Sequence, residues 1–136
     1  MKYFLLLAFM YTSNLFACSC VYRPTIDELA VKSDEVFIGS LSSFKVIDDK
    51  GVPYVWYDVE VIETVKGNVK GGYFVKDMEL MTKTSCYSQD IGLGDKYIFF
   101  SNGVSELSLK HCSSSRSYEW VEETSPEWRG LVKSLP

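Results

Sequence analysis

The chain has 136 residues, of which 46% are hydrophobic and 15% aromatic, and this length and composition suit one domain with a packed core. It carries 14 lysines and arginines against 18 aspartates and glutamates, a net charge of -4 at neutral pH. An acidic chain without a basic cluster is poorly suited to nucleic acid or an anionic membrane, because binding to both depends on positive charge that offsets phosphate.

The first 17 residues have the pattern of a secretory signal peptide. Lys2 supplies the positive start, residues 3–10 form a short apolar run, and Ala17 is the small residue before the predicted cut. The apolar run is far shorter than the roughly 20 residues of a spanning helix, so we expect no transmembrane segment. We predict a signal peptide over residues 1–17, a single domain over residues 18–136, and a secreted or periplasmic protein.

Cleavage after Ala17 would make Cys18 the first residue of the mature protein. That residue would then carry a thiol, a free amine and a nearby carbonyl. Residues 15–18 also resemble the cleavage box of bacterial lipoproteins. In this alternative Cys18 would carry a lipid and a blocked amine, and the protein would be lipid-anchored.

A short helix is predicted after the N-terminal strip. Thr25 and Glu28 have the spacing of a capping box, with Thr25 as N-cap. Ile26, Leu29 and Ala30 share one helical face, and we expect the helix to end near Ser33.

Strand patterns follow from Glu35 onward. Residues 54–64 alternate most clearly, with Val55, Tyr57, Val59 and Val61 on one predicted face. Gly39 within an apolar run indicates a bulge or a tight bend. The five predicted strands cover residues 35–47, 54–64, 73–76, 96–100 and 106–112.

Turn signals separate these strands. Asn102-Gly103 is typical of a hairpin between the fourth and fifth strands. Ser125 and Pro126 indicate the start of a C-terminal helix that ends near Ser134. Five strands with short connections favour a mainly β fold, a small closed antiparallel barrel of the OB-fold type.

The four cysteines are Cys18, Cys20, Cys86 and Cys112. An even number in a small exported domain predicts two disulfides, for which three pairings exist. A zinc site with His111 as an additional ligand is the alternative, but the chain lacks the C-x2-C spacing of zinc knuckles.

Several segments together resemble one family. These are Cys18-Ser19-Cys20 at the predicted cut, residues 28–39, residues 84–86, residues 94–100 and residues 109–112. In this combination they are similar to the N-terminal, netrin-like domain of the tissue inhibitors of metalloproteinases, over residues 18 to about 118. The resemblance implies a netrin-like OB-fold and the disulfides Cys18-Cys86 and Cys20-Cys112.

The resemblance also implies a function, namely inhibition of a zinc metalloproteinase. The main-chain nitrogen and oxygen of Cys18 would bind the target's zinc. The residues implied to contact the protease are Cys18, Ser19, Cys20, Val21, Thr84 and Ser85. The alternative is a non-inhibitory binding module that uses a strand face for a protein or glycan ligand.

No catalytic arrangement is evident in the sequence. His111 is the single histidine, so any Ser-His-Asp or Cys-His site would have to use it. Its place beside Cys112 on a strand pattern favours a structural role. We expect the protein to have no enzymatic activity, to bind no cofactor and to be a monomer.

Overall fold

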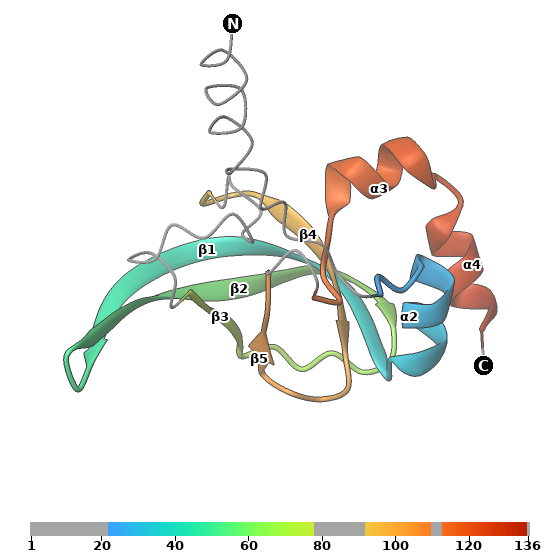
Figure 1. The fold of residues 1–136 in the computed structure, drawn as a ribbon. Coiled ribbons are helices and arrows are strands. Elements are labelled where there is room, and N and C mark those ends of the chain that lie inside the picture. Colours follow the sequence, from blue (N-terminus) through green and yellow to red (C-terminus); the bar gives the residue numbers. More distant parts are fainter. Residues whose placement is uncertain (1–21, 78–91, 110–112, 136) are drawn as a thin grey trace, which may run out of the picture.

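Two long antiparallel strands form the centre of the molecule. The computed structural model describes residues 22–77, 92–109 and 113–135. The sheet has the order β5-β3-β2-β1-β4-β6. Its strands are β1 Glu35–Asp49, β2 Val52–Lys66, β3 Tyr73–Asp77, β4 Lys96–Ser101, β5 Glu106–Leu107 and β6 Arg116–Ser117. The helices in the described part are α2 Ile26–Lys32, α3 Tyr118–Thr124 and α4 Trp128–Ser134. They gather at one end of the curled sheet, and the β1–β2 hairpin projects from the other (Figure 1).

The fold is mainly β, as predicted, but the closed five-stranded barrel is wrong. The sheet is an open half-barrel of six strands, whose two outermost strands, β5 and β6, have two residues each. β5 pairs in parallel with β3, through Phe74 opposite Glu106 and Val75 opposite Leu107. The predicted hairpin at Asn102-Gly103 is therefore also wrong, because the chain leaves β4 there and crosses to the far edge of the sheet.

A local turn replaces that hairpin. The Ser101 hydroxyl donates a hydrogen bond to the Val104 carbonyl at 3.3 Å and accepts one from the Gly103 amide at 3.2 Å. The Asn102 side chain accepts a hydrogen bond from the Asp34 amide at 3.1 Å, which attaches the turn to the start of β1.

The first predicted helix is confirmed. The Thr25 amide donates to the Glu28 carboxylate at 3.1 Å, and the Thr25 hydroxyl accepts from the Glu28 amide at 3.4 Å, which together form the capping box. Leu29 and Ala30 are buried. At the other end of α2, the Lys66 ammonium of β2 donates to the carbonyls of Ala30 and Ser33, both at 2.8 Å. A lysine at this end suits the carbonyls that a helix leaves unpaired.

The C-terminal region differs from the prediction at its start. α4 ends at Ser134, as expected, but begins at Trp128 rather than at Pro126, after a turn in which the Trp128 amide donates to the Ser125 carbonyl at 3.0 Å. Helix α3 was not predicted. Its one buried residue is Val121, so it lacks the apolar periodicity that marks a helix in a sequence.

The sheet is buried on both faces at its helical end, which explains the unbroken apolar runs of β1 and β4. One core lies between the sheet and the helices and includes Val36, Ile98, Val121 and Trp128. The second core lies inside the curl and includes Phe37, whose ring contacts those of Tyr73 and Phe99. The other buried members of this second core are Leu41, Val59, Tyr73, Val75, Tyr97, Phe99, Leu107 and Leu109.

Gly39 marks the bend of β1, and the expected irregularity is present. The pairing of β1 with β2 shifts register between Ile38 and Gly39. A methyl group built on Gly39 would lie 2.7 Å from the Val59 side chain and 3.0 Å from the Phe99 ring. Gly39 does not have the positive φ that favours glycine. The reason for a glycine here is therefore the lack of space for a side chain between Val59 and Phe99.

We predict that Gly39→Ala destabilises the protein by about 1–3 kcal/mol, the usual cost of overpacking a core. Gly130→Ala is the matched control, because Gly130 lies in the interior of α4 and the added methyl group would meet no atom within 4 Å beyond its chain neighbours and its own helix backbone. This change should stabilise by about 0.5–1 kcal/mol through helix propensity. Urea unfolding of the three proteins checks both signs, and equal stability of Gly39→Ala and the native chain would refute the close packing.

Candidate functional site

All the residues predicted to contact a protease, and both predicted disulfides, lie outside the described residues. They are Cys18, Ser19, Cys20, Val21, Thr84, Ser85, Cys86 and Cys112. His111 lies outside them as well. The described chain begins at Tyr22, so it contains the segment that joins the predicted tip to α2. We call residues 22–25 the entry strip.

A buried arginine holds the entry strip. The Arg116 guanidinium donates to the Pro24 carbonyl at 2.9 Å, across 92 positions of sequence. It also donates to the carbonyls of Ser113 at 2.6 Å and Ser115 at 2.9 Å. Arg116 is only 3% exposed. The entry strip is thus tied to the segment that precedes α3.

The charge of Arg116 is not matched by a carboxylate within the described ranges, where it donates to backbone carbonyls. Burial, with a smaller contribution from the neighbouring charge of Arg23, lowers the pKa of Arg116 to about 10. Both causes disfavour the charged form, as expected of a desolvated cation beside a second cation. Arg116 nevertheless stays protonated at neutral pH.

A second contact holds the start of the entry strip. The Tyr22 hydroxyl donates a hydrogen bond to the Glu28 carboxylate. This bond, followed by the one from the Thr25 amide, lowers the pKa of Glu28, and the same bond raises the pKa of Tyr22. One carboxylate therefore caps α2 and binds Tyr22 at the start of the entry strip.

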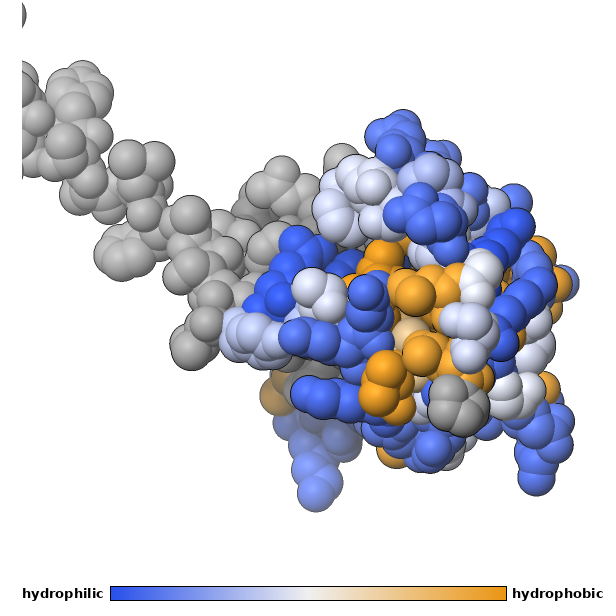
Figure 2. Space-filling model, turned by 90° about the vertical axis from the view of Figure 1, so that its right-hand side faces the viewer, coloured by the Kyte–Doolittle hydropathy of each residue, from blue (hydrophilic) through white to orange (hydrophobic). Residues whose placement is uncertain are grey.

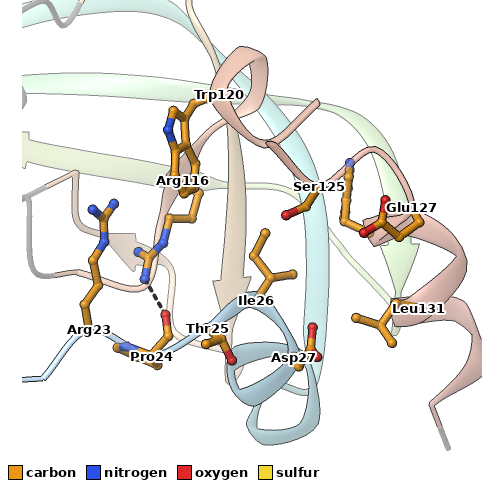
Figure 3. Close-up of a pocket in the computed structure, with 11 residues that line it drawn as sticks. Arg23, Pro24, Thr25, Ile26, Asp27, Arg116, Trp120, Ser125, Glu127 and Leu131 are labelled. Atoms are coloured by element: carbon orange, nitrogen blue, oxygen red, sulfur yellow. Dashed lines mark hydrogen bonds between the residues drawn. The ribbon is translucent and has the colours of Figure 1, made fainter. Parts of the chain in front are cut away.

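A cavity of about 350 Å³ lies beside the entry strip, between it and helices α2, α3 and α4. Figure 3 shows Arg23 and Arg116 at one end of this cavity and Asp27 and Glu127 toward the other. Its remaining lining residues are Pro24, Thr25, Ile26, Trp120, Ser125, Trp128 and Leu131. On the same side of the molecule, Figure 2 shows hydrophobic residues gathered in the middle and surrounded by hydrophilic ones.

The three tryptophans do not form one surface. Trp128 is a core residue at 1% exposure, and Trp120 is 49% exposed with the Arg23 guanidinium 5.7 Å from its ring centre. Trp56 lies on the sheet instead, stacked on Phe74 with ring centres 3.8 Å apart and an angle of 10° between the rings. The Lys45 ammonium lies 5.2 Å from the Trp56 ring centre.

An acidic group completes this sheet cluster. The Asp58 carboxylate accepts hydrogen bonds from the Ser43 hydroxyl at 2.7 Å and from the Trp56 indole at 3.0 Å. These two bonds, in that order, lower the pKa of Asp58. The cluster of Ser43, Lys45, Trp56, Asp58 and Phe74 is a second candidate surface, which we call the aromatic face.

Two negative findings hold for residues 22–77, 92–109 and 113–135. No group of three or more His, Cys, Asp or Glu side chains is arranged there to hold a metal ion. None of the helices in these ranges is long and apolar enough to cross a bilayer.

Sequence reasoning missed Arg116 and the cavity. Arg116 follows three serines, a pattern that predicts a polar surface loop. Its burial depends on Pro24, which lies 92 positions away. No local sequence pattern indicates that Arg23 lies near Arg116 and beside Trp120.

We predict that Arg116→Met destabilises the protein by about 2–4 kcal/mol, because it leaves three partly buried carbonyls without their donor. Arg129→Met is the control. Arg129 is 37% exposed and forms ion pairs with Glu63 and Glu122 at 3.2 and 3.7 Å, so its loss should cost about 1 kcal/mol or less. Urea unfolding compares the two variants, and a cost for Arg116→Met no greater than that for Arg129→Met would contradict the assigned role.

A second prediction concerns pH. The Glu28 carboxyl should titrate below its ordinary pKa of 4.5, and Tyr22→Phe should raise its pKa toward that value by removing the largest cause of the shift. Since the folded-state pKa is lowered, the stabilisation from Glu28 is present above the unfolded-state pKa and is lost as pH falls through the folded value. Carboxyl NMR titration measures this, with Asp58 as an internal reference that should not respond. An unchanged Glu28 pKa in Tyr22→Phe would exclude the contact.

No protein-family model and no curated protein matches the chain.

Proposed function

We propose that the mature chain is an exported metalloproteinase inhibitor-like protein that binds an active-site zinc through the amine and carbonyl of Cys18. The proposal rests on the predicted signal peptide, on the Cys18-Ser19-Cys20 motif directly after it, and on the resemblance to the tissue inhibitors of metalloproteinases. The mainly β fold is compatible with it, although the sheet is more open than that resemblance implies.

The observation that carries the proposal is the Arg116–Pro24 hydrogen bond. Pro24 follows Cys20 by four residues, and Arg116 follows Cys112 by four residues. Four residues span at most about 14 Å of extended chain. The bond therefore brings together the chain segments that follow the two cysteines, and a Cys20-Cys112 disulfide is compatible with it. The pairing of Cys18 with Cys86 remains a proposal from the resemblance alone.

The chemistry of the tip follows from the open coordination position of a catalytic zinc, which normally holds water. An N-terminal amine has a pKa of about 7.7–8.0, so a useful fraction is neutral near pH 7 and can donate its lone pair. The amine and carbonyl of Cys18 would close a five-membered chelate ring and displace the water. Ser19 would lie beside the zinc, and Val21, Thr84 and Ser85 would widen the contact.

Anchoring of the entry strip would make this binding less costly. A tip that is already ordered loses less conformational freedom when it enters an active site. The bonds from Arg116 to Pro24 and from Tyr22 to Glu28 order the residues immediately after the motif. Two disulfides would extend this order to Cys18 itself.

The aromatic face favours a second candidate function, a non-inhibitory binding module for a protein or glycan. The stacked Trp56 and Phe74 are only partly buried, and Lys45 and Asp58 supply charge and hydrogen-bonding capacity beside them. Partly exposed aromatic rings next to polar groups are suited to such ligands. This function needs no free amine on Cys18, so it is also compatible with a lipid anchor.

The two functions are separated by adding a single Ala before Cys18. The added residue converts the amine into an amide, which is a poor zinc ligand, so inhibition of a panel of zinc endopeptidases should be lost by at least 100-fold, roughly 2.7 kcal/mol of binding free energy. The urea midpoint should stay unchanged. Intact mass and peptide mapping without reduction establish beforehand that the native protein begins at a free Cys18 and is fully disulfide-bonded.

Two controls sharpen the result. Trp56→Ala should leave inhibition intact, because the aromatic face lies on the sheet and not on the entry strip. Equal inhibition by the native and extended proteins would exclude chelation by the amine. Inhibition by neither, or a native Cys18 that carries a lipid, would favour the binding module.

A further inference from the structure

The cavity beside the entry strip has the size and composition of a small-molecule site. Its volume of about 350 Å³ falls within the usual range for ligand pockets. Such sites combine apolar walls with a few polar groups that orient the ligand. Neither the proposed zinc chelation nor the aromatic face uses this cavity.

One end of the cavity carries two positive charges. Arg116 is 3% exposed and forms no ion pair with a carboxylate in the described ranges. A buried charge normally has a partner of opposite sign, because desolvation is costly. Arg23 lies close enough that its charge contributes to lowering the pKa of Arg116. An anion at this end would gain from both arginines.

The Arg116 guanidinium also has the chemistry to bind a carboxylate. Its guanidinium has five N–H donors, and three hydrogen bonds to backbone carbonyls account for its contacts with described residues. A guanidinium fork matches the geometry of a carboxylate, which can accept two such bonds together.

The middle of the cavity is apolar. Ile26 and Leu131 are partly buried, Trp128 is almost fully buried, and the exposed Trp120 ring stands beside Arg23. An aliphatic or aromatic ligand body would cover these side chains and remove apolar surface from water.

The far end limits the ligand to one anionic group. Asp27 and Glu127 line the cavity away from the arginines (Figure 3), and both are exposed. A second negative group on the ligand would meet these carboxylates and be repelled. The lining of the cavity is therefore positively charged at one end, apolar in the middle and negatively charged at the other end.

We propose that this cavity binds a small carboxylic acid with an apolar body. The carboxylate accepts hydrogen bonds from Arg116 and is paired with Arg23. The apolar body lies against Trp120, Ile26 and Leu131. This site is independent of the zinc-chelating tip, so its test does not depend on inhibition.

The experiment titrates the isotope-labelled mature protein with octanoate and follows the three tryptophan indole N–H signals by NMR. Trp120 and Trp128 line the cavity and should shift in a saturable way, whereas Trp56 on the aromatic face should not. Octanol, with the same body and no charge, should bind at least ten times more weakly. Acetate, which has the carboxylate alone, should also bind at least ten times more weakly.

Variants locate the carboxylate. Arg23→Gln should weaken octanoate binding about tenfold while preserving the fold, because Arg23 is exposed and its guanidinium lies against the exposed Trp120 ring. Lys45→Gln is the matched control, since Lys45 makes the same kind of contact with the distant Trp56, and it should bind octanoate normally. If Arg23→Gln does not fold, Leu131→Asp replaces it by placing a repelling carboxylate in the apolar wall.

Several outcomes would overturn the proposal. They are the absence of a saturable shift at Trp120 and Trp128, equal shifts at Trp56, equal binding of octanol and octanoate, and unchanged affinity in whichever cavity variant folds. The first two would mean that the cavity is not a site, and the last two that it does not select a carboxylate. Loss of inhibition after Ala extension would leave all of these readouts unaffected.

Discussion

The buried guanidinium of Arg116 is the contact on which the arrangement of the helical end depends. It joins the entry strip at Pro24 to the segment before α3, through carbonyls that are far apart in the sequence. Burying a cation is expensive, and three carbonyl acceptors offset part of that cost without neutralising the charge. The same side chain thereby fixes the residues that follow the predicted tip and gives the neighbouring cavity its positive end.

The sheet provides the frame for this arrangement because β1 and β4, which pair with each other, are covered on both sides. Val36 and Ile98 face the core under the helices, whereas Phe37 and Phe99 face the core inside the curl. The rings of these two phenylalanines lie 5.4 Å apart. The two cores share β1 and β4, so each core helps to hold the strands that the other packs against. The middle of these strands is therefore buried although the half-barrel is open.

Local features of the fold were predictable from the sequence, and distant pairings were not. The capping box of Thr25 and Glu28 and the alternation of β2 depend on neighbouring residues, so their patterns were sufficient. The parallel pairing of β5 with β3 was missed because it is decided by burial of Leu107 in the curl, which competes with the hairpin tendency of Asn102-Gly103. For the same reason the site was only partly predictable. The cysteine motif is a local signal, whereas Arg116 becomes a buried anchor only through its contact with Pro24.

Backbone dynamics of the entry strip test the central claim, that Arg116 holds this strip in one conformation. The measurement is the NMR order parameter of the Tyr22 and Arg23 amides in the native protein and in Arg116→Lys, whose single ammonium cannot reproduce the arginine fork. The account predicts values near 0.85, typical of a rigid backbone, in the native protein and below about 0.6 in the variant, with the amides of β1 unchanged. Low values at Tyr22 and Arg23 in the native protein, or high values that persist in the variant, would contradict it.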